Sequence, residues 1–372
     1  MNLEYTPEQI ALRDSVRGYL ASVAESTPWL PPKDRTDGSE TTWRGLAELG
    51  VTGLLVPEEF GGAGGDMVDA GVVLAELGRV LDRGPWISSA IAVPRTLQRL
   101  GGSDASAELL CGIADGSTVV GLGLHRAHDP VVTATRRDGA VTVRGSTAEV
   151  PDADAATVLL VPAHDGDRIS LFAIDATAPG VSRVAIPTAD RTRRRFHVEY
   201  TDTPARPLGE LRAEMVDAVI DDVLIATAAD AAGAAERILE LTVAYAKARK
   251  QFGTPIGGFQ AVAHLCVDML ETVELARGGA MHGLWVADAG TDEQRHLSAM
   301  RVKAFSGRLA TVGDTAIQIF GGIGFTWEHQ AHFYLERLLE WSTFLGRPDR
   351  YLREVGAHLV RTTYPGLSAV DG

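Results

Sequence analysis

The chain has 372 residues, 45% of them hydrophobic, so it is long enough to bury the cores of two or three domains. Its formal net charge of −14 excludes the basic surface that typifies proteins binding nucleic acid. The two cysteines, Cys111 and Cys266, are too few for a disulfide framework or a zinc site, so we expect a reducing compartment and no metal.

Residues 1–114 are predicted to form a helical domain. The first residues, MNLEYTPEQ, lack the basic and apolar segments of a signal peptide, so we expect a cytoplasmic protein. Thr6 and Gln9, on either side of a proline, are typical of a capping box at the start of a helix. Further helices are predicted over residues 43–50 and 69–81. The glycines between them fit neither a P-loop nor a dinucleotide fingerprint, which indicates a connector.

Residues 115–206 change to short runs rich in valine and isoleucine, separated by Asp-Gly and Gly-Ser turns. These runs predict a small β domain, with strands within STVVGLGL, PVVTATRR, AVTVRGS, ATVLLVPA and RISLFAI. The arginines of RTRRRF (191–196) form a basic run in an acidic chain. A run of this length is typical of a solvated loop, so we expect no recognition role for it.

Residues 207–372 return to a helical pattern and are predicted to form a bundle. Small residues such as Gly233 let helices approach closely, which suits such packing. Apolar stretches such as 218–229 are interrupted by Asp221 and Asp222, so no membrane span is expected. The predicted helices cover residues 216–249, 258–288, 293–320 and 328–345.

Three motifs indicate a family. They are LAELGVTGLLVPEEFGG near the front, RKQFGTPIGGFQ at residues 249–260 and QIFGGIGFTWEH near the end. In these motifs, and in its α, β, α order, the chain resembles the acyl-CoA dehydrogenase family over nearly its entire length. The resemblance implies an α+β fold with an N-terminal α-helical domain, a middle β-barrel-like domain and a C-terminal four-helix bundle. It also implies FAD as the cofactor, an acyl-CoA thioester as the substrate and electron-transfer flavoprotein as the acceptor.

In this family FAD binds at a dimer interface, where one subunit cradles the isoalloxazine ring and the neighbour's helical domain holds the pyrophosphate and adenine. The chain matches the second half of that site. Arg249 stands where the family has the arginine that pairs with the pyrophosphate, a task that suits a planar guanidinium. The glycines of the motif let backbone amides approach phosphate oxygens without a Cβ in the way. The further matching residues are Phe252, Gln260, Gln318, Gly321 and Gly322.

The catalytic half of the family's site is not matched. The glutamate that abstracts the α-proton occupies one of two positions in the family, and this chain has Leu345 at one and Val223 at the other. Neither side chain can take a proton. The loop that contacts the flavin ring and CoA corresponds to HRAHDP (125–130), and the ring-stacking Trp-Ile-Thr corresponds to Glu-Val-Pro at residues 149–151. Proline has no N–H to donate to the flavin, and glutamate adds negative charge beside it.

This asymmetry predicts a non-catalytic subunit of a heteromeric acyl-CoA dehydrogenase, with no catalytic residue of its own. The α2β2 enzymes of actinobacteria that act on steroid side-chain thioesters are of this kind. A homologous partner subunit then supplies the base, the CoA pocket and the ring contacts, and the heteromer holds half the flavins of a homotetramer. Two alternatives stay open. One is a self-sufficient enzyme with a displaced base, for which Asp222, Glu240 and Glu340 are the nearest carboxylates, and the other is a flavin-free structural subunit.

Overall fold

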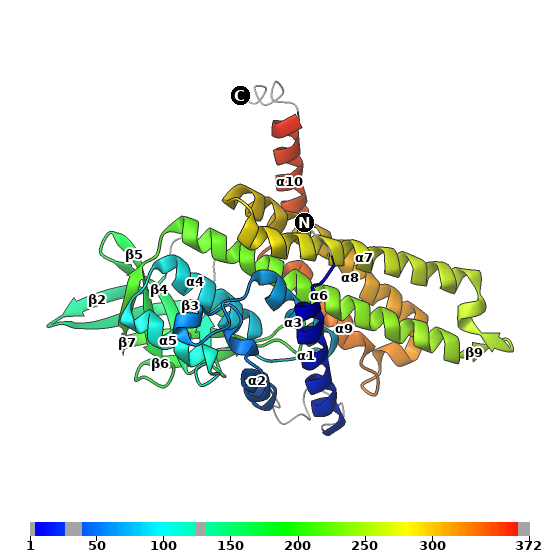
Figure 1. Cartoon of the computed structure of the whole chain (residues 1–372), viewed down its shortest axis with the longest axis horizontal. Coiled ribbons are helices and arrows are strands. Elements are labelled where there is room, and N and C mark those ends of the chain that lie inside the picture. The colour runs from blue at the N-terminus through cyan, green and yellow to red at the C-terminus, as the bar shows by residue number, and fades with distance from the viewer. Residues whose placement is uncertain (1–3, 27–38, 124–130, 364–372) are drawn as a thin grey trace.

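The computed structural model describes residues 4–26, 39–123 and 131–363, which form helices, then a sheet, then helices again (Figure 1). The helices before the sheet are α1 (Pro7–Ser26), α2 (Ser39–Glu48), α3 (Met67–Arg79), α4 (Val93–Leu100) and α5 (Asp104–Ala114). The capping box predicted for the first helix is confirmed. The backbone N–H of Thr6 donates to Gln9 Oε1 at 3.1 Å, and that of Gln9 donates to Thr6 Oγ1 at 3.2 Å.

The middle of the chain forms one mixed sheet with the strand order β6-β7-β3-β2-β4-β5-β8, and β1 pairs with β4. Five of these strands overlap the predicted runs, and β3, β4 and β5 extend beyond them, whereas β6, β7 and β8 were not predicted. Neighbouring strands are mostly antiparallel, but β2 and β1 run parallel to β4. The strands are β1 (Val120–Leu122), β2 (Thr133–Arg137), β3 (Ala140–Pro151), β4 (Val158–Asp165), β5 (Arg168–Asp175), β6 (Val181–Ile186), β7 (Arg195–Pro204) and β8 (Arg206–Glu210).

The C-terminal part is built on α6, whose 36 residues run along the whole molecule and pack against the helices on both sides (Figure 1). Helix α10 packs against α8 and was not predicted. Among the described residues no helix has the length and apolar character needed to cross a membrane. The helices are α6 (Ala213–Ala248), α7 (Gln260–Ala289), α8 (Asp292–Phe320), α9 (Ala331–Thr343) and α10 (Pro348–Thr363).

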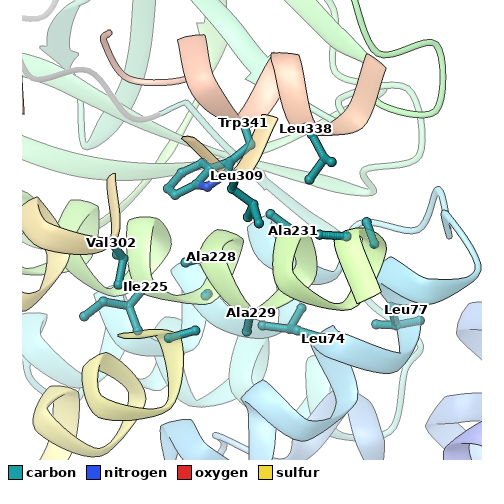
Figure 2. Packing of buried hydrophobic residues seen from close by; sticks show 14 of the residues in the cluster. Leu74, Leu77, Ile225, Ala228, Ala229, Ala231, Val302, Leu309, Leu338 and Trp341 are labelled. Carbon is teal, nitrogen blue, oxygen red and sulfur yellow. The ribbon is translucent and has the colours of Figure 1, made fainter. Parts of the chain in front are cut away.

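The main core lies where α3, α6, α8 and α9 meet, and Figure 2 shows Leu74 of α3, Ala229 of α6 and Trp341 of α9 in it. The predicted close approach of helices occurs at Gly233. A Cβ added there would lie 2.0 Å from the carbonyl oxygen of Ala75, so α3 and α6 touch through backbone. This contact fixes α6 against the N-terminal helices and thereby sets the position of the residues that α6 presents to the sheet.

Candidate functional site

A cavity of about 90 Å³ lies where the sheet, α6 and α9 meet. Val223 of α6 and Leu345, just after α9, both line it, so the structure brings together the two positions where the family has its base. Glu149 and Pro151, which stand where the family contacts the flavin ring, line it too. Sites for drug-sized ligands enclose roughly 300–1,000 Å³, so this cavity leaves little room for a flavin ring and a thioester.

Two of the residues that line the cavity form an ion pair. Arg195 at the start of β7 places Nη2 2.5 Å from Oε1 of Glu340 on α9, and the two side chains are only 15% and 11% exposed. The Arg195 guanidinium also lies over the Phe344 ring, 4.8 Å from its centre, and Nη1 lies 3.7 Å from Oε2 of Glu149. One arginine therefore holds together three cavity-lining groups from β3, α9 and the segment after α9.

A second arginine, Arg337 of α9, is buried beside the cavity with its donors satisfied. Its Nε lies 2.6 Å from Asp190 Oδ2, and its Nη1 lies 3.0 Å from both carboxylate oxygens of Asp230 on α6. Its Nη2 donates to the carbonyl of Asp82 at 3.0 Å and to Thr192 Oγ1 at 2.5 Å. The two carboxylates raise the pKa of Arg337 against the effect of burial. This network joins the loop between β6 and β7 to the helical bundle.

The interpretation of RTRRRF as a solvated loop is wrong. Arg193 pairs with Asp230 at 2.8 Å, and Arg194 pairs with Asp154 at 2.5 Å. Their side chains are 18% and 21% exposed, close to that of Arg195. All three line the cavity, because each arginine pairs with a carboxylate on another part of the chain. Those carboxylates are distant in the sequence, so the run alone gave no sign of them.

Asp152, directly after β3, is a cavity-lining carboxylate that the sequence gave no reason to select. It is buried and accepts a hydrogen bond from Ser88 Oγ at 3.1 Å. Burial raises its pKa to about 6, while the charges of Arg193 and Arg194 oppose that rise. Another buried ionisable group, Lys303 of α8, donates to the carbonyl of Trp341, a cavity-lining residue, and burial lowers its pKa to about 7.

The three carboxylates considered as displaced bases lie in different surroundings. Asp222 is fully buried, and its Oδ2 lies 2.8 Å from Arg95 Nε and 2.7 Å from Arg99 Nη2. Glu240 is half-exposed and pairs with Arg79 at 2.8 Å. Neither lines the cavity, whereas Glu340 does. Glu340 is thus the one candidate of the three that shares a cavity with the family's base positions.

The predicted FAD residues lie on two segments that meet at the opposite end of the bundle, near the β9 hairpin in Figure 1. Arg249 ends α6, and Gly321 follows α8. The two helix ends touch through Tyr245 and Phe320, whose ring centres are 4.8 Å apart. In the described part of the chain the Arg249 guanidinium has no ion-pair partner, so it is not the surface ion pair that a lone arginine often forms. The predicted residues that are exposed here are Arg249, Phe252, Gln260, Gln318, Gly321 and Gly322.

The space around this end suits an extended phosphate-bearing group. Gly321 has a φ of +65°, and a Cβ added at either Gly321 or Gly322 would meet nothing within 4 Å. Phe252, in the hairpin of β9 (Lys250–Gln251) and β10 (Thr254–Pro255), has a φ of +52° and is 95% exposed. Open backbone next to an unpaired guanidinium can accept phosphate oxygens. The predicted HRAHDP loop (125–130) lies outside the described residues.

Comparison with protein families gives two matches. Residues 6–117 match the model for the acyl-CoA dehydrogenase N-terminal domain, and residues 222–346 match the model for the acyl-CoA dehydrogenase C-terminal domain. The chain is 36% identical over 365 residues to acyl-CoA dehydrogenase FadE34 of Mycobacterium tuberculosis, covering 95% of the chain and 48% of that relative. It therefore spans about half the length of FadE34. Acyl-CoA dehydrogenase IpdE2 of the same organism is 34% identical over 320 residues, covering 85% of the chain and 86% of the relative.

Solved structures have the same fold. A variant of the Tcur3481-Tcur3483 steroid ACAD has a TM-score of 0.82 and 28% identity, over 96% of this chain and 98% of that chain. The ChsE4-ChsE5 complex from Mycobacterium tuberculosis has a TM-score of 0.84 over 97% of this chain and 99% of that chain, and its 22% identity shows the fold alone.

Proposed function

The chain belongs to the acyl-CoA dehydrogenase family of FAD-dependent oxidoreductases acting on CH–CH bonds, and we propose that it is the non-catalytic subunit of a heteromer. The exposed end of its bundle holds the pyrophosphate and adenine part of FAD. A homologous partner subunit supplies the base, the flavin-ring contacts and most of the CoA pocket, in an α2β2 assembly. The observation that carries this proposal is the ion pair of Arg195 and Glu340 inside the small cavity at the family's base positions.

The cavity favours a subunit without chemistry of its own. Abstraction of an α-proton needs an uncommitted carboxylate within reach of the thioester. Val223 and Leu345 cannot serve, and Glu340 is engaged by Arg195. Asp152, which also lines the cavity, accepts a hydrogen bond from Ser88 and lies within the charge of Arg193 and Arg194. Admitting a substrate would require these cavity-lining side chains to separate, which would leave a largely buried guanidinium without its nearest carboxylate.

The bundle end supports the cofactor role. Arg249, at the end of α6, presents a guanidinium without an ion-pair partner in the described part of the chain. The two glycines with open space above their backbone follow α8, whose end touches that of α6. FAD bound there would supply the hydride acceptor, while the residues of this chain would only hold its phosphates. The exposed aromatic side chains around Arg249, Phe252 above all, favour burial by a partner because apolar surface left in water is costly.

The proposed substrate class rests on a solved structure. A structure described as a steroid ACAD is similar to this chain at 28% identity. On this likeness we propose a steroid side-chain CoA thioester as the substrate of the heteromer. Electron-transfer flavoprotein as the acceptor and the cytoplasm as the location are proposed from the sequence.

Flavin measurements on the chain alone and on the co-expressed heteromer test the proposal. The isolated chain should carry little FAD and show no acyl-CoA dehydrogenase activity, whereas the heteromer should carry half the flavin of a homotetramer. In the heteromer Arg249→Ala should weaken FAD binding by about ten- to a hundredfold, since a charge-assisted bond is worth roughly 1.5–3 kcal/mol. Arg249→Lys should recover part of the loss. Arg168→Ala, at an arginine on β5 that is 72% exposed, is the matched control.

Each competing function has its own outcome. Turnover by the isolated chain at a stoichiometric flavin load would identify a self-sufficient enzyme. A heteromer whose flavin content and FAD affinity are unchanged by Arg249→Ala would remove this chain from the cofactor site and favour a flavin-free structural subunit.

A further inference from the structure

The loop between β6 and β7 reaches the helical bundle beside the glycine segment through Arg191. The guanidinium carbon of Arg191 lies 4.7 Å from the centre of the Trp327 ring, which is cation–π geometry. Its Nη1 lies 3.6 Å from Oε1 of Glu336 on α9. Trp327 comes two residues after the short helix η6 (Gly321–Phe325), which contains the glycines of the proposed cofactor half-site.

The Trp327 indole is held by more than one neighbour. The rings of His332 and Phe333 lie 5.5 Å and 6.0 Å from it, and the His332 ring is nearly perpendicular to it. Both neighbours are buried in the first turn of α9. Arg191 contributes the further contact, and it comes from the sheet domain. The indole is therefore fixed between α9 and a loop more than 130 residues earlier in the chain.

Backbone hydrogen bonds join the turn that carries Trp327 to η6. The N–H of Thr326 donates to the carbonyl of Ile323 at 3.1 Å, and that of His329 donates to Thr326 at 3.2 Å. These two bonds join the turn to the end of η6, and Gly321 and Gly322 stand at the start of that short helix. Gly324 of this segment is buried against Phe320 and Ile317 of α8, whereas Ile323 and Phe325 are 44% and 69% exposed.

Glu336 is the carboxylate that pairs with Arg191. Burial raises the pKa of Glu336, and the charge of Arg191 opposes this rise. The carboxylate side chain is 19% exposed and that of Arg191 is 47% exposed, so the pair lies at the edge of the protein, where solvent weakens it. A half-exposed arginine with one distant carboxylate contributes little to folding, but its stacking fixes the direction of the indole.

We propose that Arg191 is a positioning residue for the cofactor half-site, holding Trp327 and through it the Gly321–Gly322 backbone in the geometry that receives the FAD pyrophosphate. The inference rests on the function proposed above. It assigns two tasks to the basic run 191–196: Arg195, at the start of β7, lines the subunit's own ring site, while Arg191, in the loop before β7, shapes the site offered to the partner's flavin.

The test is FAD titration of the deflavinated heteromer with Arg191→Ala, Arg191→Lys and Trp327→Leu. Loss of an exposed cation–π contact should weaken FAD binding by about two- to fivefold in Arg191→Ala. Arg191→Lys should restore most of the affinity because it keeps the cation. The double variant Arg191→Ala with Trp327→Leu should bind FAD as weakly as Trp327→Leu alone, because the arginine acts through the indole. The KM for acyl-CoA should stay unchanged.

Arg206→Ala is the matched control, since Arg206 is 46% exposed, pairs with Glu108 at 2.5 Å and belongs to β8 rather than to the loop between β6 and β7. Wild-type FAD affinity in Arg191→Ala, with Arg249→Ala weakened, overturns the positioning role and leaves the cofactor half-site standing. Wild-type affinity in both variants overturns the half-site itself. Equal losses in Arg191→Ala and Arg206→Ala, or additive losses in the double variant, also overturn the positioning role. If Arg191→Ala fails to assemble, the FAD affinities of Arg191→Lys and Trp327→Leu are compared instead. Wild-type FAD affinity in Trp327→Leu then overturns the positioning role, whereas weaker binding in Trp327→Leu than in Arg191→Lys supports it.

Discussion

Glu340→Gln separates a non-catalytic subunit from an enzyme with a displaced base. Glutamine keeps the volume of Glu340 and removes the charge that pairs with Arg195. A general base contributes about 10²–10⁴-fold to rate, so an enzyme that used Glu340 would lose turnover on that scale. We expect instead that turnover per bound flavin of the heteromer is unchanged, because the two positions of the family's base carry Leu345 and Val223 and the proposed base belongs to the partner.

The same substitution should lower stability by an amount that the geometry sets. A hydrogen bond to a charged group contributes about 1.5–3 kcal/mol. The pair is only slightly exposed, at 15% and 11%, so solvent screening reduces this little. Arg195 keeps its stacking on Phe344 and its distant contact with Glu149, which places the expected loss toward the lower end of that range. The unfolding midpoint should fall by about 2 °C, because an unfolding entropy of roughly 2.1 cal/mol/K per residue over a chain of 372 residues gives about 1.3 °C per kcal/mol.

The assay pairs turnover per flavin with thermal unfolding for wild type, Glu340→Gln and Glu240→Gln in the heteromer. Glu240 is the matched control because it is also paired with arginine but lies outside the cavity. A hundredfold or larger drop in turnover of Glu340→Gln, with flavin content and assembly intact and Glu240→Gln unaffected, would falsify the assignment of this subunit as non-catalytic.

Three further predictions concern stability. Because folding raises the pKa of Asp152 from 3.8 to about 6, the charged form is disfavoured in the folded chain. The free energy of unfolding of the wild type, relative to that of Asp152→Asn, should thus fall as the pH rises from 4 to 6 and stay constant above pH 6. Equal pH dependence of the two proteins in denaturant melts would contradict this. Gly233→Ala should cost about 1–3 kcal/mol, since its Cβ would lie 2.0 Å from the Ala75 carbonyl oxygen, and an unchanged urea midpoint would show that α3 and α6 can separate. Arg337→Met should lower the free energy of unfolding by about 3–5 kcal/mol, because it leaves buried aspartates unpaired. If that is the cause, the substitution should destabilise the chain less in an Asp190→Asn background. An equal destabilisation in that background would point to lost packing instead.

The sequence predicted the elements whose pattern is local. The capping box at Thr6 and the long helices of the bundle are examples, because the polar cap and the helical period can both be read within a few residues. Strand β6 was missed because most of its residues are exposed and it lacks an apolar face. Helix α10 was missed for a related reason, since Tyr351 is its one buried residue among those described.

The site could be predicted where a sequence motif fixes which residues correspond to the family's, and could not be predicted where it depends on contacts between distant parts of the chain. Val223 and Leu345, far apart in the sequence, were assigned to the two positions that the family uses for its base, and both line one cavity. Arg193 was misinterpreted because its carboxylate partner is 37 residues away on α6. Asp152 gave no signal at all, since an aspartate in a turn between strands is ordinarily solvated. Charge pairing across elements is decided by the fold, and it determined which groups are available for chemistry here.

The two ends of the C-terminal bundle differ in what would lower their free energy. At the cavity, arginines and carboxylates are buried and paired, so a ligand that separated Arg195 from Glu340 would have to replace a largely desolvated ion pair before it gained any contact. At the other end Phe252 and Phe325 are 95% and 69% exposed, and Arg249 has no ion-pair partner among the described residues. Covering that end with an apolar surface and an anion removes hydrophobic area from water and pairs a charge at the same time. The paired charges of the cavity and the open bundle end therefore favour the proposed division of labour: accepting a partner's flavin would add stability, whereas binding a substrate of its own would cost this chain an internal ion pair.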